Sequence, residues 1–593
     1  MIKLCVNAGQ NDVLIFTGSG ATSGFHKLAW ALKINQPRVA EETVVITGPY
    51  EHHANILLWR DYGTHLIRVR DGKDGNVDIV HLEEELKFWK EKKQHLLVVM
   101  SAASNVTGII TDTELVAEIA HRHGALAIFD YAAGGPYLEI DMNLSENGYK
   151  DAIVVSPHKF VGGPGTPGIL VAKKRLFKNS IPDRTGGGTV EYVSRTMHQY
   201  KSEIEEREEG GTPDIIGCIR AAISFQLKQD IGTNIIQMRE EDLCRKAFLK
   251  WRENHCICVL GSSTAKRLPI FSFVTIHELS GKLIHHHFIS TLLNDIFGIQ
   301  SRSGCACAGP YGHDLFGLSE TKSKIFLSLM TGKVLAHEKN GKTKGLRIIK
   351  PGFTRLNLPY FYDDDLIDYI IESVDLVTKY GWKLLPQYTF DCCTGVWHRK
   401  DIGHLDASMP LLKDINFHKK GLLNVPPANK TKNTPNLKEV LRQAQKIFKE
   451  AETVPKASHM STESKQLQDA LPRDKLKMRW FLTPDEASKI MASKDQPFQK
   501  IRRYKLPFKF KQETEDSNTN RQTVSNFRDS SSDRKQFNND KYVFLPSIKG
   551  KDQHVLLKKT GRATLKKRFY SDSDVHARSA TESESENGKE TKH

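Results

Sequence analysis

Short apolar runs alternate with helix-like stretches through the first part of the chain, and this alternation limits the possible folds more than any other feature. Each run has the length of one strand and ends in small or polar residues. The predicted strands are Asp12–Phe16, Thr43–Thr47, His95–Met100, Ala125–Asp130, Ala152–Val155 and Gly168–Ala172. The pattern favours an α/β fold with a mostly parallel sheet, in which ligands lie at the carboxyl ends of the strands.

The fifth of these strands leads into Ser156-Pro157-His158-Lys159-Phe160, and a glycine-rich loop follows. Taken alone, Lys159 is most simply a solvated lysine at a strand end. The alternative is that the glycines let the backbone approach a bound ligand, while Ser156 and His158 provide polar contacts and Lys159 provides an amine for a Schiff base. The polar residues at the other strand ends favour this alternative.

Three further strand ends offer groups that suit a ligand. The stretch Thr17–Gly24 opens a helix with small residues, and its bare backbone amides suit a phosphate, although an ordinary strand-to-helix connection would look similar. His52 follows the strand Thr43–Thr47, where an imidazole can lie flat over an aromatic ring or simply face solvent. Asn105 follows the next strand and adds an amide to the same edge of the sheet.

Two charged side chains are expected to need partners. Asp130 ends an apolar strand, where an unpaired carboxylate is unfavourable, so either a protonated ring nitrogen or a buried Arg or Lys should balance it. Arg355 lies among apolar neighbours in the predicted strand Gly352–Tyr360. Its guanidinium requires an anion, which could be a substrate carboxylate or a structural Asp or Glu.

A second, smaller α/β domain is predicted to carry a reactive thiol. Its first strand is Pro269–His277, and a loop that follows the helix His286–Phe297 contains Cys305 and Cys307. No second cysteine or histidine pair follows at zinc-site spacing, and the side chains of the consecutive histidines at 285–287 point around a helix, so we predict no metal site. Leu346–Lys350 is expected to form one of the closing strands.

Apolar patterning divides the chain into four regions. We predict a large domain at 1–260, the smaller domain at 261–385, a partly ordered extension at 386–450 and a disordered tail at 451–593. The tail holds about 30 Lys and Arg against about 20 Asp and Glu, and so carries much of the net charge of +16. Its basic and aromatic stretch Arg502–Phe510 could contact nucleic acid, an acidic membrane or an acidic partner, or remain a solvated linker.

Cysteine content and apolar run length indicate the compartment. Nine cysteines in 593 residues do not suggest a disulfide framework, and the first residues are too short for a signal peptide. No apolar run is long enough to cross a bilayer, and no mitochondrial targeting segment is evident. We therefore expect a reducing, cytoplasmic location.

These motifs together resemble the class V, fold-type I enzymes that depend on pyridoxal 5′-phosphate (PLP), most closely the branch of cysteine desulfurases and selenocysteine lyases. The resemblance covers about residues 12–385. It implies a mostly parallel seven-stranded sheet in the large domain and a homodimer. It assigns contacts with the cofactor phosphate to Ala21, Thr22, Ser156, His158 and, from the neighbouring subunit, Thr212.

The resemblance also implies which residues surround the cofactor ring. Lys159 would form the Schiff base, His52 would stack on the ring, and Asp130 would pair with the pyridinium nitrogen and keep the ring an electron sink. Asn105 would lie near both ring and substrate, and Arg355 would hold the substrate carboxylate.

Cys307 matches the sulfur-accepting cysteine of the family. The implied reaction removes sulfur from L-cysteine, yields alanine and leaves a persulfide on Cys307, from which a sulfur-acceptor protein could be loaded. The alternatives are another class V enzyme without sulfur transfer, namely an aminotransferase, lyase or epimerase, and a catalytically silent scaffold that acts through its tail.

The chain departs from the family pattern at three places. After Asp130 the sequence reads Tyr131-Ala132-Ala133, without the usual glutamine that hydrogen-bonds the phenolic oxygen of the ring. Cys305 stands two residues before Cys307, so either thiol could accept sulfur or the pair could form a disulfide. Relatives also carry several tens of residues before the first strand, so we expect an N-terminal arm to be missing here.

Overall fold

The computed structural model describes residues 1–332, 345–401, 436–452, 460–492 and 504–511, together with the backbone of 416–417 and 423–424. All of them belong to one compact unit, Met1–Asp533. Among the described helices, none combines the length and the apolar character that a membrane crossing requires.

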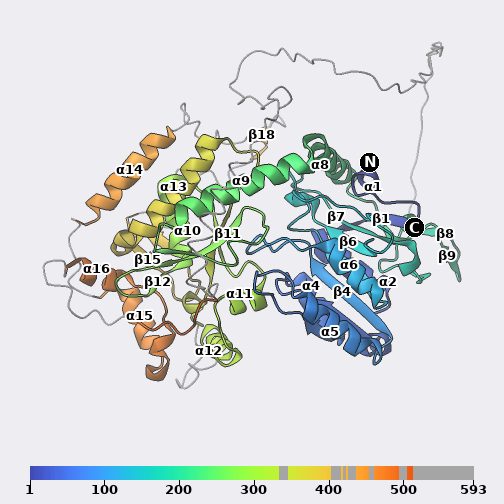
Figure 1. The fold of residues 1–593 in the computed structure, drawn as a ribbon, viewed down its shortest axis with the longest axis horizontal. Coiled ribbons are helices and arrows are strands. Elements are labelled where there is room, and N and C mark those ends of the chain that lie inside the picture. Colours follow the sequence, from blue (N-terminus) through green and yellow to red (C-terminus); the bar gives the residue numbers. More distant parts are fainter. Residues whose placement is uncertain are drawn as a thin grey trace, which may run out of the picture. The chain divides into compact units, whose positions relative to one another are not determined.

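The large domain is built on a seven-stranded sheet (Figure 1). Its order is β1-β7-β6-β5-β4-β2-β3, and β7 alone runs antiparallel to its neighbours. This confirms the predicted mostly parallel sheet. The strands are β1 Asp12–Gly18, β2 Thr43–Thr47, β3 His65–Arg68, β4 His95–Ser101, β5 Leu126–Asp130, β6 Ala152–Val155 and β7 Gly168–Lys173.

Helices cover both faces of this sheet, which is why its central strands are apolar throughout. Alternate residues of β2 point to opposite faces: Val45 joins a cluster with Phe25 and Trp59, whereas Val44 and Ile46 join the main core. The first cluster lies under α2 (Gly20–Ala31) and α4 (Ala54–Tyr62). The main core includes residues of α5 (Ile79–Lys90), α6 (Thr113–Arg122) and α8 (Ile215–Ile231).

The smaller domain contains an antiparallel sheet of order β10-β11-β14-β13, with β12 paired to β11. These strands are β10 Ile257–Val259, β11 Ile270–Ile276, β12 Leu283–Ile284, β13 Arg302–Gly304 and β14 Phe353–Asn357. The helices α9 (Thr233–Trp251), α10 (His286–Phe297) and α13 (Asp364–Tyr380) pack on it. The strand predicted at Leu346–Lys350 is wrong, because Arg347–Ile349 forms a short 3-10 helix that buries Ile348 and Ile349.

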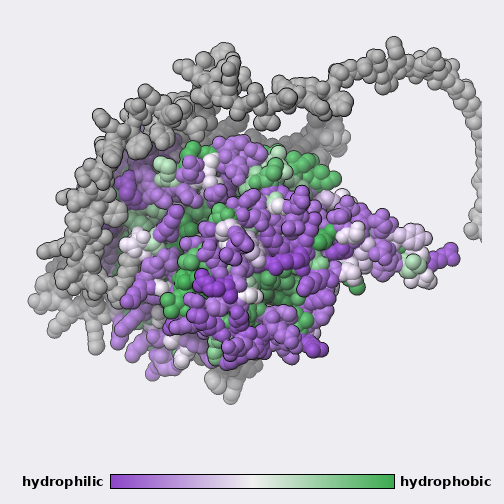
Figure 2. All heavy atoms as spheres, turned by 45° about the vertical axis from the view of Figure 1, so that its right-hand side comes forward, coloured by the Kyte–Doolittle hydropathy of each residue, from purple (hydrophilic) through white to green (hydrophobic). Residues whose placement is uncertain are grey.

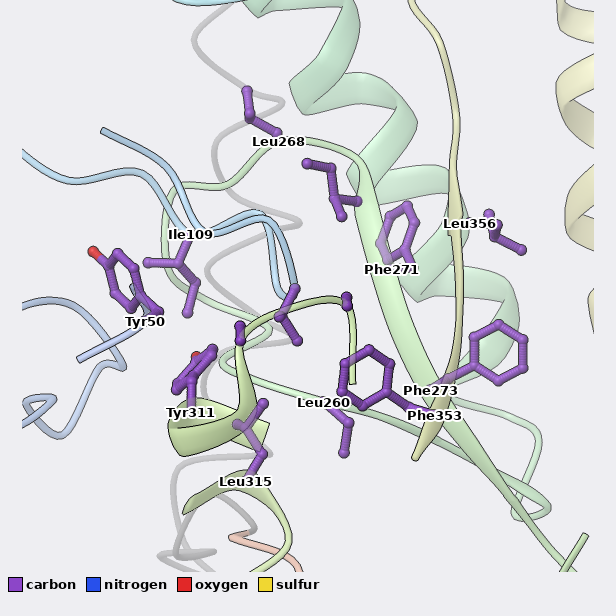
Figure 3. Packing of buried hydrophobic residues seen from close by; sticks show 14 of the residues in the cluster. Tyr50, Ile109, Leu260, Leu268, Phe271, Phe273, Tyr311, Leu315, Phe353 and Leu356 are labelled. Atoms are coloured by element: carbon purple, nitrogen blue, oxygen red, sulfur yellow. The ribbon is translucent and has the colours of Figure 1, made fainter. Parts of the chain in front are cut away.

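The two domains share one hydrophobic core. Figure 3 shows Phe271, Phe353 and Leu356 of the smaller sheet in one cluster with Tyr50 and Ile109 of the large domain, to which α11 (Gly309–Leu315) contributes Tyr311 and Leu315. The loop that holds Cys305 and Cys307 leads directly into α11, so this core fixes the loop relative to the ends of the large-domain strands.

Part of the region beyond residue 385 is folded. It contains β15 Tyr388–Phe390, β16 Trp397–Arg399, α14 Leu437–Glu450, α15 Thr462–Ala470 and α16 Pro484–Ala492. The predicted disorder from residue 451 onward is therefore wrong for 460–492 and 504–511, where Trp480, Phe481 and Phe508 are buried. The rest of the predicted tail lies outside the described residues.

Candidate active site

The residues that follow β1 and β6 meet at the start of α2. Ala21 N donates a hydrogen bond to Ser156 Oγ at 2.9 Å. Gly20 has φ +61°, and a Cβ there would lie 2.8 Å from His158 Cε1 and 3.0 Å from Ser156 Oγ. The structure thus brings Ala21, Ser156 and His158 together at the N-terminus of α2, with Thr22 exposed beside them. This arrangement suits a phosphate group.

Lys159 and Asp130 stand at the ends of the adjacent strands β6 and β5. Asp130 is 3% exposed and accepts a hydrogen bond from Ala132 N at 2.7 Å, and no salt bridge to it occurs within the described residues. Burial raises the pKa of Asp130, while the Ala132 amide and the charge of Lys159 oppose that rise. Lys159 keeps access to solvent, yet the surrounding protein removes enough solvation to lower its pKa, against the attraction of Asp130.

His52 is held as a neutral imidazole. Burial, followed by the charge of Lys159, lowers its pKa to about 4. Its Nδ1 accepts a hydrogen bond from Ala54 N at 3.1 Å, so the proton of the neutral ring resides on Nε2. The ring therefore offers an N–H donor, and a flat uncharged face, near the lysine.

The loop with the two cysteines is fastened to the large domain by three hydrogen bonds. Asn105 Nδ2 donates to Ala306 O at 2.7 Å, and His53 N donates to Cys307 O at 2.8 Å. Gly309 N donates to His53 Nε2 at 2.9 Å. Ala306 and Cys307 have φ values of +50° and +58°, which are unfavourable for residues with a Cβ. The contacts with the large domain therefore hold the loop in a conformation that it would not otherwise favour.

Two arginines lie opposite each other on β13 and β14. Arg302 and Arg355 are direct partners in the antiparallel register, and like charges at such positions repel each other. Arg355 Nη1 donates to Asn105 O at 2.7 Å, while its buried Nε has no partner among the described residues. Arg302 Nη2 lies 3.5 Å from Cys307 Sγ. This pair of cations would be balanced by an anion such as a substrate carboxylate.

Sequence reasoning missed the role of two residues beside His52. His53 anchors the cysteine loop, as described above. Glu51 is 1% exposed and accepts hydrogen bonds from Ser101 N (2.9 Å), Ser101 Oγ (2.6 Å) and Asn55 Nδ2 (2.7 Å). Burial raises the pKa of Glu51 to about 7. The contacts of His53 with Gly309 and of Glu51 with Ser101 join segments that are distant in sequence, so no local pattern could have indicated them.

Thr212 is exposed and lies three residues before Ile215, the first residue of α8. Within the described residues no side-chain hydrogen bond joins it to the other predicted site residues, so its role stays a prediction.

A separate depression of about 490 Å³ is lined by residues that include Arg68, His313 and Lys511. None of the predicted site residues lines it, and its charges are already paired, since Arg68 contacts Asp314 and Lys511 contacts Asp71. The candidate active site therefore lies at the strand ends and not in this depression.

The residues at the strand ends fit PLP. A buried carboxylate without an ion-pair partner suits a protonated ring nitrogen, the neighbouring lysine suits the aldehyde, and the helix start with Ser156 and His158 suits the phosphate. Asn105 Oδ1 is also buried without a partner among the described residues. Fold and site together define the class of protein as a fold-type I enzyme that depends on PLP.

Comparison with known proteins names the family. The aminotransferase class-V family model matches residues 1–330, more than half of the chain, so the chain belongs to that family. It is 30% identical over 313 residues to a probable cysteine desulfurase of Halalkalibacterium halodurans, a match that spans 52% of this chain and 72% of the relative. It is 28% identical over 330 residues to a probable cysteine desulfurase of Halobacterium salinarum, which spans 55% and 74%.

Solved structures agree on the fold. The apo structure of a cysteine desulfurase from Thermococcus onnurineus superposes with a TM-score of 0.50 at 23% identity, and the match covers 64% of this chain and 82% of that one. At this identity the likeness supports the architecture alone.

Proposed function

We propose that this enzyme is a PLP-dependent cysteine desulfurase, which removes sulfur from L-cysteine to give alanine and a persulfide on Cys307. The observation that carries the proposal is the position of the cysteine loop. Hydrogen bonds from Asn105 and His53 hold it against the large domain, and Arg302, the register partner of Arg355, lies 3.5 Å from Cys307 Sγ through its Nη2. A thiol beside these arginines can reach a substrate whose carboxylate they bind.

The cofactor's own contribution is to withdraw electrons from the substrate α-carbon once it is bound. The chain would hold it through the amine of Lys159, the carboxylate of Asp130, the face of His52 and the phosphate contacts at the start of α2. Because the aldehyde must react with a neutral amine, the lowered pKa of Lys159 favours its attachment at neutral pH.

The remaining groups orient substrate and move protons. Arg355, with Arg302 opposite it, would bind the substrate carboxylate, while the Lys159 amine would remove and return the α-proton. Arg302 Nη2, 3.5 Å from Cys307 Sγ, would stabilise the thiolate. The thiolate then attacks the substrate sulfur, a sulfur–sulfur bond forms, and the electron pair of the broken carbon–sulfur bond stays with the substrate carbon, which is protonated to alanine.

The proposal includes a homodimer in which Thr212 reaches the phosphate of the neighbouring subunit. Helix α8, which begins just after Thr212, exposes a row of apolar side chains, and Figure 2 shows such apolar patches on an otherwise hydrophilic face. The exposed side chains of α8 are Ile215, Ile216, Ile219, Ile223 and Leu227. A row of this kind is typical of a surface that another protein covers.

The test is turnover of L-cysteine by the full chain with added PLP and a thiol reductant. We expect equal amounts of alanine and sulfide, and a visible absorbance band that borohydride removes. Cys307→Ala should abolish both products and keep the band, whereas Lys159→Ala should lose the band. Cys393→Ala, in the connection between β15 and β16, is the matched control and should behave as the wild type.

Two outcomes would contradict the proposal. Amino-group transfer or racemisation without sulfide would replace it with another class V activity, and absence of the absorbance band would favour a scaffold.

A further inference from the structure

Cys305 and Cys307 occupy the same tight turn. Ala308 N donates a hydrogen bond to Cys305 O at 3.0 Å, and the two central residues, Ala306 and Cys307, both have positive φ. A turn of this kind brings the Cα atoms of residues i and i+3, here Cys305 and Ala308, within about 7 Å of each other. Cys307 lies inside the turn, two positions after Cys305, and a disulfide spans Cα–Cα distances of about 4.4–6.8 Å. The turn therefore keeps the two cysteines at a backbone separation that suits a disulfide.

The anchoring of the loop is uneven. The carbonyl oxygens of Ala306 and Cys307 accept hydrogen bonds from Asn105 and His53 of the large domain. The Cys305 thiol is half-buried and forms no hydrogen bond among the described residues. The backbone of Cys307 is thus held by the large domain, whereas the Cys305 thiol is not committed to another hydrogen-bond partner among the described residues.

The other cysteines are poor candidates for thiol chemistry. Burial raises the pKa of six of them, which disfavours the nucleophilic thiolate; these are Cys5, Cys218, Cys244, Cys256, Cys258 and Cys392. In contrast, the turn has a guanidinium at its edge, since Arg302 Nη2 lies 3.5 Å from Cys307 Sγ. Negative charge that develops on sulfur in this turn is therefore stabilised.

We propose that Cys305 is the resolving thiol of the active site, which releases the sulfur that Cys307 accepts. This inference rests on the proposed function. The Cys305 thiolate attacks Sγ of the Cys307 persulfide, the Cys305–Cys307 disulfide forms, and the bond between Cys307 Sγ and the terminal sulfur breaks. The electron pair leaves with the terminal sulfur as hydrosulfide, and the proton of Cys305 goes to solvent.

The step needs no added oxidant. The terminal sulfur is reduced to hydrosulfide while the two thiols of the chain are oxidised to the disulfide. A new turnover then requires an external dithiol, small or carried by a protein, to reduce the pair. Because the disulfide closes a very small ring at an accessible site, such a dithiol should reduce it readily.

The first experiment is a single turnover of the full chain with PLP and L-cysteine, without reductant. The wild type should release about one sulfide per chain. The mass of the chain should fall by two hydrogen atoms, and the disulfide should map to Cys305 and Cys307. Cys305→Ser should keep a persulfide on Cys307, a gain of one sulfur atom of about 32 Da, and should release sulfide only after dithiothreitol is added. Cys393→Ser should match the wild type. Release of sulfide by Cys305→Ser as fast and as completely as by the wild type would overturn the proposal.

A second arm does not depend on desulfurase activity. Sodium polysulfide serves as the sulfur donor for the reduced full chain, and the excess is removed before mass analysis. The wild type should again end as the Cys305–Cys307 disulfide and Cys305→Ser as the persulfide. If this arm succeeds while L-cysteine yields no alanine, the proposed function fails and the resolving thiol stands. If alanine forms but the wild type retains a stable persulfide beside a free Cys305, the resolving thiol is excluded and the proposed function stands.

Discussion

At the scale of single residues, the phosphate cradle depends most on Gly20. A side chain at this position would meet His158 Cε1 at 2.8 Å, and the φ of +61° adds strain. We expect Gly20→Ala to weaken PLP binding at least tenfold, because His158 or the helix start must move. Gly63→Ala is the matched control, since Gly63 has φ +82° but open space around it. Fluorescence titration should show a loss of affinity for PLP in Gly20→Ala only. Equal affinities of the two variants would contradict a role for the close contact with His158.

His285 is a residue whose titration should affect stability. Burial lowers its pKa to about 3, and the ring stacks on Trp480 at 5.2 Å. In the unfolded chain its pKa is about 6.5. Between these values the unfolded state binds a proton that the folded state does not, so His285 alone should lower the free energy of unfolding by about 1.4 kcal/mol for each pH unit of acidification below about 6.5.

Urea unfolding from pH 7 to pH 5 measures this dependence. His285→Gln should reduce the slope of the free energy of unfolding against pH by about 1.4 kcal/mol per pH unit, which is the contribution of one proton. A slope unchanged by His285→Gln would show that this histidine does not titrate as its burial predicts.

At the scale of elements, the pairing of β13 with β14 places two guanidinium groups side by side. Replacement of Arg355 by Gln removes the repulsion between the two guanidinium groups. It also removes the proposed contact with the substrate carboxylate. We therefore expect KM for L-cysteine to rise at least tenfold, while the thermal midpoint of the protein without substrate stays unchanged or rises. The absorbance of bound PLP should persist. A lower thermal midpoint with an unchanged KM would mean that Arg355 is structural.

Elements were predictable where their pattern is local. The apolar runs that end at Asp130 and Val155 indicated both the strands and the edge of the sheet that carries Asp130 and Lys159. β3 (His65–Arg68) was missed because its half-exposed residues show no apolar run. The contact between Arg302 and Arg355 depends on the register of two strands that lie far apart in the sequence. Residue patterns alone cannot provide such a register, because it is fixed by the packing of the whole smaller sheet.

At the scale of the whole molecule, residues 460–492 and 504–511 continue the smaller domain. Leu283 N donates to Trp480 O at 3.1 Å and Leu482 N donates to Leu283 O at 2.9 Å, so this segment adds a strand-like edge beside β12. Farther on, a Cβ at Gly317 would lie 2.1 Å from Lys509 O, and only glycine permits this approach. The sequence of these residues is polar and basic, and their few aromatic side chains become buried only when the domain folds.

This packing predicts that the segment stabilises the enzyme. Trp480 is 1% exposed and its Nε1 donates to Ile349 O at 2.8 Å. We expect Trp480→Ala to lower the free energy of unfolding by about 3–5 kcal/mol, because it leaves a cavity beside His285 and an unpaired carbonyl. Leu476→Ala, in the same segment but 40% exposed, should change it by less than about 0.5 kcal/mol. Urea titration followed by circular dichroism measures both. Similar small losses in the two variants would show that the segment is not part of the folded domain, since a docked Trp480 cannot be removed without exposing β12 and α10 to water.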